Sequence, residues 1–139
     1  MKQFFKEIKI KTTGQKFFEI TDIILNIVNN TKINEGMLNL SILHTTASLI
    51  IQENADPNVQ KDLSNFFDKT APMNTDLYIH NNEGKDDMPA HIKTAITNTH
   101  LTLSIRSKKL ILGTWQGVYL FEHREVKKKR IIFLHIMGN

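Results

Sequence analysis

Three histidines stand beside polar loops, where the chain pattern predicts the ends of strands or helices: His44, His80 and His91. A rigid scaffold often presents functional side chains at such positions. Three neutral imidazoles that leave one coordination position free are a known arrangement for a catalytic metal ion, zinc above all. The chain has no cysteine, so a metal site must use His, Asp or Glu. Spacing alone does not bring these histidines together, and a single histidine is more often an ordinary polar residue.

The loop HNNEGKDDMPAH, residues 80–91, carries two of these histidines at its ends. Asp86 or Asp87 is a suitable cap for a helix that begins at Pro89. His91 then lies in the first helical turn, where the dipole disfavours imidazolium and leaves a neutral imidazole for a metal. The same helix end offers free N–H groups to an anion. The loop is therefore a capped helix start, a pair of metal ligands or an anion site.

Acidic side chains near these loops are candidates for proton transfer or for orienting an imidazole. Besides Asp86 and Asp87, the main candidate is Glu53, which follows an apolar strand and shares its loop with Asn54. A strand-end carboxylate that is simply solvated is the alternative. Asp56 precedes Pro57, and its role as a helix cap explains it sufficiently.

Hydroxyl groups follow His44 in the segment HTTAS, and they are candidates for binding an oxyanion: Thr45, Thr46 and Ser48. No nucleophile elbow surrounds Ser48, which argues against a serine hydrolase. The single tryptophan, Trp115, predicts either the floor of a binding pocket or ordinary core packing. Glu122 and Arg124 share one face of the strand that follows, where a simple ion pair between them would explain both. The other three histidines are expected to be structural or solvent-facing: His100, His123 and His135.

The elements that must position these side chains follow two spacings. Two-residue alternation predicts strands over residues 5–11 and 38–43, with a further apolar strand at 49–51. Helical spacing predicts a helix from Thr21 or Asp22 to about residue 30 and another from Pro57 to about Phe67. The second helix should bury Val59, Leu63, Phe66 and Phe67, and a third, from Pro89, carries Ile92, Ala95 and Ile96.

The last part of the chain is predicted to be mainly β structure. The segment DLYIH is expected to be extended, and four strands follow: LTLSI, KLILG, QGVYLFEHRE and RIIFLHIM. The order is no regular βαβ alternation, and the C-terminal strands favour antiparallel pairing. We therefore expect an α+β fold, a compact single domain over residues 1–139 of packed, mainly antiparallel sheets with a few helices.

Composition narrows the class of protein. At 139 residues, with 40% hydrophobic and 23% charged residues, the chain suits one globular domain and is too apolar to be disordered. The net charge of +4 is mild, and the basic run at 127–130 is expected in a solvated hairpin turn. Basic and aromatic residues are not combined on one face, which argues against nucleic-acid binding. The N-terminal segment has no signal-peptide core or membrane-spanning run, so we expect a cytoplasmic location.

Three motifs together resemble the YjbQ family, also catalogued as secondary thiamine-phosphate synthase enzymes: HTTASLIIQENADP (44–57), HNNEGKDDMPAHIK (80–93) and LGTWQGVYLFEHR (112–124). The likeness extends over almost the whole chain, with the motifs in the family's order. It implies a compact α+β fold, assembly as a homotrimer, and a pocket in which His44, His80 and His91 bind a metal ion or an anion.

The resemblance also assigns residues around that pocket. It matches the family's acidic and polar positions to Glu53, Asn54, Asp86 and Asp87, and its tryptophan motif to Trp115, Gln116, Glu122 and Arg124. We expect catalytic roles for Glu53, Asp86, Asp87 and Arg124, and substrate contacts from Thr45, Ser48, Asn54, Lys93, Trp115 and Gln116. The segment HLTLSIRSKKL departs from the pattern, because the family commonly has a proline and a glycine around Ser104 and Lys108. A redrawn turn is therefore expected there.

The family label implies a reaction that joins a phosphorylated thiazole to a pyrimidine diphosphate and releases pyrophosphate. A divalent metal, most directly zinc, with Arg124 or Lys93 and the helix N-terminus, would favour the departing pyrophosphate. Trp115 is the candidate for stabilising a pyrimidine carbocation. Two alternatives stay open. One is a hydrolase in which metal-bound water attacks with Glu53 or Asp86 as base, and the other is a non-catalytic protein that binds a metal or metabolite.

Overall fold

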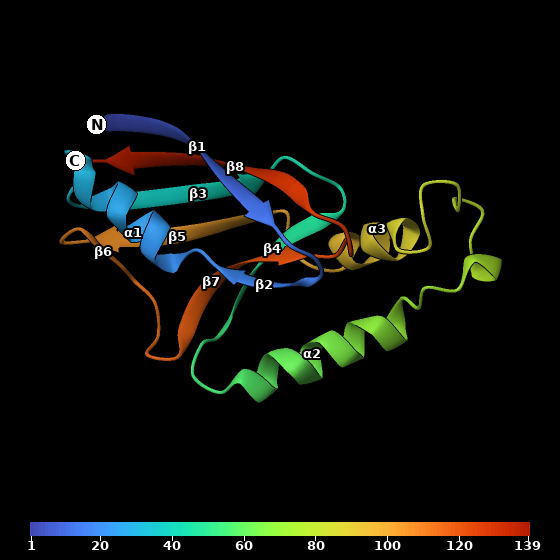
Figure 1. Cartoon of the computed structure of the whole chain (residues 1–139). Helices are drawn as coiled ribbons and strands as arrows, with labels where there is room; N and C mark the ends of the chain where they lie inside the picture. The colour runs from blue at the N-terminus through green and yellow to red at the C-terminus, as the bar shows by residue number, and fades with distance from the viewer.

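Two antiparallel sheets form the body of the protein in the computed structural model, which describes residues 1–139 (Figure 1). The larger sheet has the strand order β1-β8-β3-β5-β6 and the smaller the order β2-β7-β4. Three helices accompany them, as expected for an α+β fold. The elements are β1 Lys2–Thr12, β2 Lys16–Glu19, α1 Thr21–Asn30, β3 Gly36–Ile42, β4 Ala47–Glu53, α2 Pro57–Thr70, the 3₁₀ turn η1 Thr75–Leu77, α3 Asp87–Ala95, β5 His100–Arg106, β6 Lys109–Leu110, β7 Gln116–Glu122 and β8 Lys128–Gly138.

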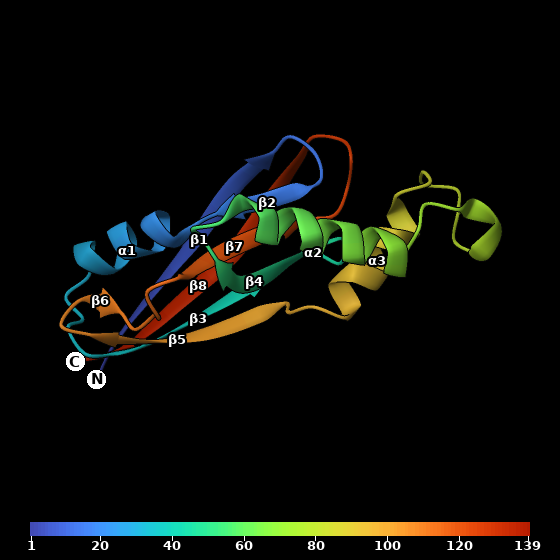
Figure 2. The same ribbon diagram turned by 90° about the horizontal axis from the view of Figure 1, so that it is seen from below.

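The main hydrophobic core lies between the two sheets. Alternate residues of β8 and β3 face it, including Leu134, Ile136 and Leu40, all fully buried. This two-residue alternation is the pattern that the sequence predicted for strands with one buried face. Helix α1 adds Ile24 and Val28 to the same core, and Figure 2 shows α1 on the same side of the larger sheet as the smaller sheet.

Strand β7 is buried on both faces because α2 covers the side of the smaller sheet that faces away from the core. A cluster of four buried aromatic residues lies there: Phe17, Phe67, Tyr119 and Phe121. The rings of Phe17 and Phe121 stack with centroids 4.0 Å apart. The molecule therefore has three layers, with α2 as the outer one.

A buried ion pair closes one end of the space between the sheets. Arg130 donates to Glu122 from Nε at 2.7 Å, and its Nη2 donates to Thr46 Oγ1 at 3.0 Å. Thr12 Oγ1 donates to the same carboxylate at 2.7 Å. The expected solvated hairpin turn at 127–130 is therefore wrong. Residues 128–130 belong to β8, Arg130 is buried, and β7 and β8 belong to different sheets between which the chain crosses.

The first two helices start where the sequence predicted, with differences in detail. Helix α1 has no side-chain cap, because its N-cap residue is the apolar Ile20. The hydroxyl of Thr21, the first helical residue, donates to Glu19 Oε2 at 2.9 Å and accepts from the Val118 N–H. Helix α2 is capped by Asp56, whose Oδ1 accepts from the Asn58 N–H at 2.9 Å, and runs three residues beyond Phe67. Of its four predicted core residues only Phe67 is buried. Phe66 is exposed, while Val59 and Leu63 are half-buried.

The segment between α2 and α3 protrudes from the body as an arm, residues 72–85 (Figures 1 and 2). The predicted extended piece DLYIH is wrong, because the chain there makes η1 and then irregular structure. Helix α3 begins at Asp87, two residues before Pro89, and its Ala95 and Ile96 are exposed. None of the helices is long and apolar enough to cross a membrane.

The turn between β5 and β6 has an unusual backbone. Ser107 and Lys108 adopt φ angles of 51° and 60°, a left-handed conformation uncommon for residues other than glycine. Glu35 accepts from the Ser107 N–H at 2.9 Å, and Lys108 Nζ donates to the Thr31 carbonyl at 2.9 Å. The predicted strand KLILG is reduced to the two residues of β6. The expected redrawn turn is thus a tight left-handed one held by side chains.

Candidate metal centre

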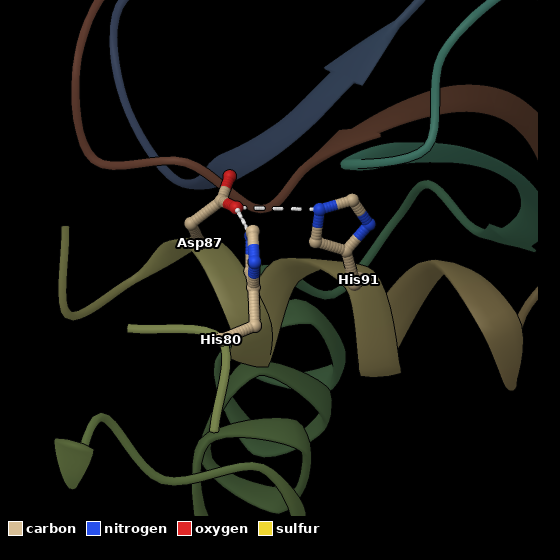
Figure 3. A group of neighbouring side chains, drawn as sticks. All are labelled: His80, Asp87 and His91. Atoms are coloured by element: carbon tan, nitrogen blue, oxygen red, sulfur yellow. Dashed lines mark hydrogen bonds and ion pairs between the residues drawn. The ribbon is translucent and has the colours of Figure 1, made fainter. Parts of the chain in front are cut away.

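Two imidazoles and one carboxylate meet at the start of α3. The ligand atoms of His80, Asp87 and His91 all lie within 4.8 Å of one another. Asp87 Oδ2 is 2.7 Å from His80 Nε2 and 3.3 Å from His91 Nε2 (Figure 3). The three side chains converge on one point, as the ligands of a metal ion must.

The local sequence explains how these side chains meet. Asp87 and His91 are four residues apart on α3, so their side chains lie on the same face of the helix. His80 comes from the arm, and the chain reaches α3 after Gly84, whose φ of +107° is a conformation that glycine adopts without strain. The rings of His80 and His91 are 5.6 Å apart between centroids and nearly perpendicular.

Arg124 holds the two aspartates of the loop from the opposite side. Its Nε donates to Asp86 Oδ2 at 2.9 Å, its Nη1 donates to Asp87 Oδ1, and its Nη2 donates to the Glu83 carbonyl at 3.0 Å. Both aspartates are buried. The predicted ion pair between Glu122 and Arg124 is therefore wrong, because the Arg124 side chain binds the two aspartates whereas the Glu122 carboxylate binds Arg130.

The electrostatics of the loop favour ionised carboxylates. Burial alone would raise the pKa of Asp86, but the Glu125 N–H and the Arg124 guanidinium outweigh it and hold that pKa below its ordinary value. Burial likewise opposes ionisation of Asp87, while the His80 hydrogen bond and the charge of Arg124 lower its pKa. Asp87 is thus a carboxylate with Oδ1 bound to Arg124 and Oδ2 turned toward the two imidazoles.

This donor set suits a divalent transition metal. Imidazole nitrogen and carboxylate oxygen are ordinary zinc ligands, and three protein ligands with one free position are typical of catalytic zinc sites. The contact between Arg124 and Asp87 is of the kind that orients a metal-binding carboxylate. His80, Asp87 and His91 would hold the ion.

A cavity of about 660 Å³ borders this group. Its lining includes His91 and residues from α3 and the two loops beside it: His44, Thr45, Met88, Ile92, Thr94, Ala95, Ile96, Thr97 and Thr99. A volume of this size is in the range of small-molecule sites. Thr45, a predicted substrate-binding residue, faces this cavity.

His44 lines the cavity but is not in the group of three ligands. Strand β3 ends at Ile42, and the half-buried imidazole of His44 accepts the Ile131 N–H at Nε2 over 2.8 Å. Burial and the charge of Arg130 lower its pKa. The family resemblance implied that His44 joins His80 and His91 in binding a metal ion or an anion. In the structure the group whose ligand atoms converge contains Asp87 with those two histidines, and His44 is outside it.

Lys93 and Ser48 face away from the metal group. Lys93 is two residues from His91, about 200° around the helix, and its buried ammonium donates to Asp68 at 2.6 Å. Ser48 Oγ is 2.9 Å from His123 Nε2, and both residues are fully buried. A second, smaller cavity of about 130 Å³ lies beside Lys93 and His123. Burial and the charges of Lys93 and Arg130 lower the pKa of His123 to about 3.

Four further predicted site residues gather at the other end of the smaller sheet. Glu53 pairs with Gln116, whereas Ala47, at the opposite end of β4, pairs with Glu122. A seven-residue strand separates the two ends by roughly 20 Å. The Asn54 N–H donates to the Trp115 carbonyl at 2.9 Å, and Trp115 is exposed. Within this chain these residues are not brought to the metal group, and their functional roles stay predictions.

Asp87 as a candidate metal ligand is the feature that sequence reasoning missed. The signal was present in the spacing, since Asp87 and His91 form a D-x-x-x-H pair on one helical face. The cap role obscured it, although neither Asp86 nor Asp87 makes a side-chain cap bond to α3.

The family model and the most similar relatives point to the same protein family. The model of the UPF0047 protein YjbQ-like family matches residues 6–139. The UPF0047 protein sll1880 of Synechocystis is 43% identical over 93% of this chain and 88% of its own length. The UPF0047 protein YjbQ of Escherichia coli O157:H7 is 40% identical over 96% of both chains.

Solved structures agree with this assignment. The crystal structure of an uncharacterised YjbQ/UPF0047 protein from Clostridium acetobutylicum superposes with a TM-score of 0.87 at 35% identity, over 95% of this chain and 99% of that one. A YbjQ-like protein of unknown function from Sulfolobus solfataricus shares the fold, with a TM-score of 0.90 at 24% identity, over 99% of both chains. None of these descriptions names a reaction. From the motifs, the fold and these relatives, the chain belongs to the YjbQ-like UPF0047 family.

Proposed function

We propose that this protein is a metal-dependent enzyme that acts on a small phosphorylated substrate. The observation that carries the proposal is the convergence of His80, Asp87 and His91 at the edge of a cavity large enough for a small molecule. A bound divalent ion, for which zinc is our first choice, would supply a Lewis acid to phosphate oxygens. The chain's own residues would hold the ion and orient the substrate.

A cation held by the site and the net positive charge of the chain support an anionic substrate. Arg124 keeps Asp87 ionised and oriented, so the carboxylate is ready for a cation. The chain has a net charge of +4, and a hollow near Thr12 is lined by four lysines: Lys11, Lys127, Lys128 and Lys129. A basic surface of this kind attracts anions to the protein and raises the rate at which they associate with it.

Thiamine phosphate synthesis is the named form of this proposal, and it comes from the family resemblance. In that reaction the metal and nearby cations would favour departure of pyrophosphate from the pyrimidine. Lys93 is not available for this role, because its ammonium is buried against Asp68 on the other side of α3. Trp115 is at the far end of the smaller sheet, so a role for it would require a second copy of the chain.

The hydrolytic alternative has less support. It needs a base beside the metal, and Glu53 lies at the far end of β4. Asp86 is held by Arg124 and by the Glu125 N–H, and these contacts lower its pKa. A carboxylate stabilised in this way is a weak base.

Homotrimer formation is part of the same proposal. The face of the larger sheet that is turned away from the core carries uncharged residues on its central strands, among them Met37, Phe133 and Met137. The arm exposes Leu77 and Ile79. Exposed apolar surfaces of this kind often mark contacts between proteins. The mass of the protein in solution, measured by light scattering, tests whether it forms a trimer. A cytoplasmic location stays a separate prediction, made from the N-terminal sequence.

Metal content and a paired-substrate assay test the function. The purified protein should contain stoichiometric metal, and His80→Ala, Asp87→Ala and His91→Ala should each lose it. His100→Ala, an exposed histidine outside the group, is the matched control and should keep its metal.

Release of pyrophosphate only when the pyrimidine diphosphate and the thiazole phosphate are both present supports transfer. Metal that survives all three substitutions would refute the site, and bound metal without turnover would favour the non-catalytic alternative.

A further inference from the structure

We infer that His44 is a neutral hydrogen-bond donor for the ligand in the 660 Å³ cavity and is not a metal ligand. The inference builds on the proposed function, because it assigns a contact to the substrate of the same site. It starts from the bond between the Ile131 N–H and His44 Nε2.

A backbone N–H can only donate, so the nitrogen that accepts it must carry a lone pair. The bond from Ile131 to Nε2 measures 2.8 Å, a normal length for N–H donation. His44 is therefore neutral with its proton on Nδ1, since imidazolium would have a proton on both nitrogens. The fold imposes this tautomer, because the Ile131 N–H follows the last pair between β3 and β8, Ile42 with Ile132, and has no carbonyl partner.

A metal ion cannot bind such a ring without changing the fold or the chemistry. Nε2 is engaged by the backbone, so only Nδ1 remains, and it would have to lose its proton to give an imidazolate. His80 and His91 carry no such restriction, because neither accepts a backbone N–H. Asp87, not His44, completes their group.

The Nδ1–H group is free to meet a ligand. His44 lines the cavity, and Nδ1 has no partner in the protein. The one fully buried side-chain polar atom without a partner is Thr94 Oγ1, so Nδ1 is accessible from outside the protein. The cavity also presents Thr45, Thr97 and Thr99. A fixed N–H donor among threonines, beside a candidate metal site, suits an acceptor such as a phosphate oxygen.

The tautomer can be observed directly. Long-range ¹H–¹⁵N spectra of histidine-labelled protein at about pH 7.5, above the ordinary pKa of histidine, should show His44 neutral with Nδ1 protonated. Zinc should shift the nitrogens of His80 and His91 and leave the His44 Nδ1 proton in place. An imidazolium signal, a proton on Nε2, or loss of the Nδ1 proton on zinc addition would each overturn the inference.

The ligand contact is tested with inorganic phosphate and the variant His44→Gln. The glutamine carbonyl can still accept the Ile131 N–H, but the side chain has no donor at the Nδ1 position. Phosphate should shift the His44 Nδ1–H signal of the zinc-loaded protein, and His44→Gln should bind phosphate roughly 10- to 100-fold more weakly while retaining zinc. His100→Gln, the same substitution at an exposed histidine, should change neither.

The outcomes separate this inference from the proposed function. If the wild-type protein binds no zinc, the proposed function fails, and the phosphate titration of the metal-free protein then decides the role of His44. A shift of Nδ1–H supports the inference, and no shift overturns it. Undiminished phosphate binding by His44→Gln, or loss of its zinc, also overturns it.

Discussion

Two arginine–carboxylate systems lie near the end of β7, and they differ in the partners that their carboxylates contact. Glu122 and Arg130 are enclosed between the sheets, and Thr12 and Thr46 complete their hydrogen bonds. Asp87 gives one oxygen to Arg124 and turns the other toward His80 and His91. The first system is complete within the protein, whereas the second has the capacity to bind a cation. A buried charge pair whose partners are all structural groups is itself structural, whereas one whose carboxylate oxygen faces two imidazoles is a candidate metal site.

The largest expected effect is on the enclosed pair. Arg130→Ala leaves the fully buried Glu122 carboxylate without its cation, and breaking a buried pair in this way costs about 3–5 kcal/mol. Urea unfolding should report this loss of free energy of unfolding. A decrease below about 1 kcal/mol would mean that the pair is solvated and that the contrast between the two systems is false.

Asp87→Asn tests the second system. The amide keeps the shape of the side chain but removes the negative charge, so metal affinity should fall by more than the roughly 10- to 100-fold typical of residues that only orient a ligand. Competition with a chelator measures this change. Asp68→Asn, at an exposed aspartate paired with Lys93 outside the metal group, is the control. Equal affinities of the two variants would remove Asp87 from the site.

His123 should give the protein a distinct pH dependence. Its folded-state pKa, about 3, lies below the unfolded value of 6.5, so the unfolded chain binds an extra proton between these values. The free energy of unfolding should then fall by about 1.4 kcal/mol for each pH unit below 6.5. His123→Gln should flatten this slope in urea unfolding between pH 6.5 and about pH 4.5. If the variant keeps the same dependence of the free energy of unfolding on pH, other titrating groups must cause that dependence.

Asp86 and Asp87 should affect the stability of the fold at a lower pH than His123 does. Their folded pKa values lie below the ordinary 3.8, so the stability that they contribute is present above that value and is lost as the pH falls through the folded values. Arg124→Gln should reduce this acid loss and weaken metal binding by roughly 10-fold, because Asp87 loses its orienting partner. Acid titration followed by circular dichroism, with and without metal, measures both effects. If the wild-type protein and Arg124→Gln unfold over the same acid pH range, the role of Arg124 is contradicted.

The fold could be predicted largely because its signals are local. Alternation in β3 and β8 identified strands with one buried face, and Asp56 with Pro57 identified the start of α2. The exposure of Phe66 was not predictable, because it depends on which side of α2 meets the smaller sheet. Arg130 was misassigned because the crossing between sheets is a property of topology, not of the residues at the turn.

The site was predictable in part. His80 and His91 could be singled out by their places beside a helix start, and the structure brings them together. The pairing of Arg124 with Asp86 and Asp87 joins residues 38 and 37 positions apart, so no local spacing reveals it. The state of His44 depends on a backbone N–H of another strand, which only the assembled sheet provides.

The left-handed turn at Ser107 and Lys108 shows how side chains can substitute for glycine. Each left-handed residue other than glycine costs about 1 kcal/mol or more. Lys108 offsets part of this cost by donating to the Asn29 and Thr31 carbonyls at the end of α1. Lys108→Gly would thus relax the backbone but release the helix end. The two changes oppose each other, so we expect glycine and lysine at this position to give similar net stability.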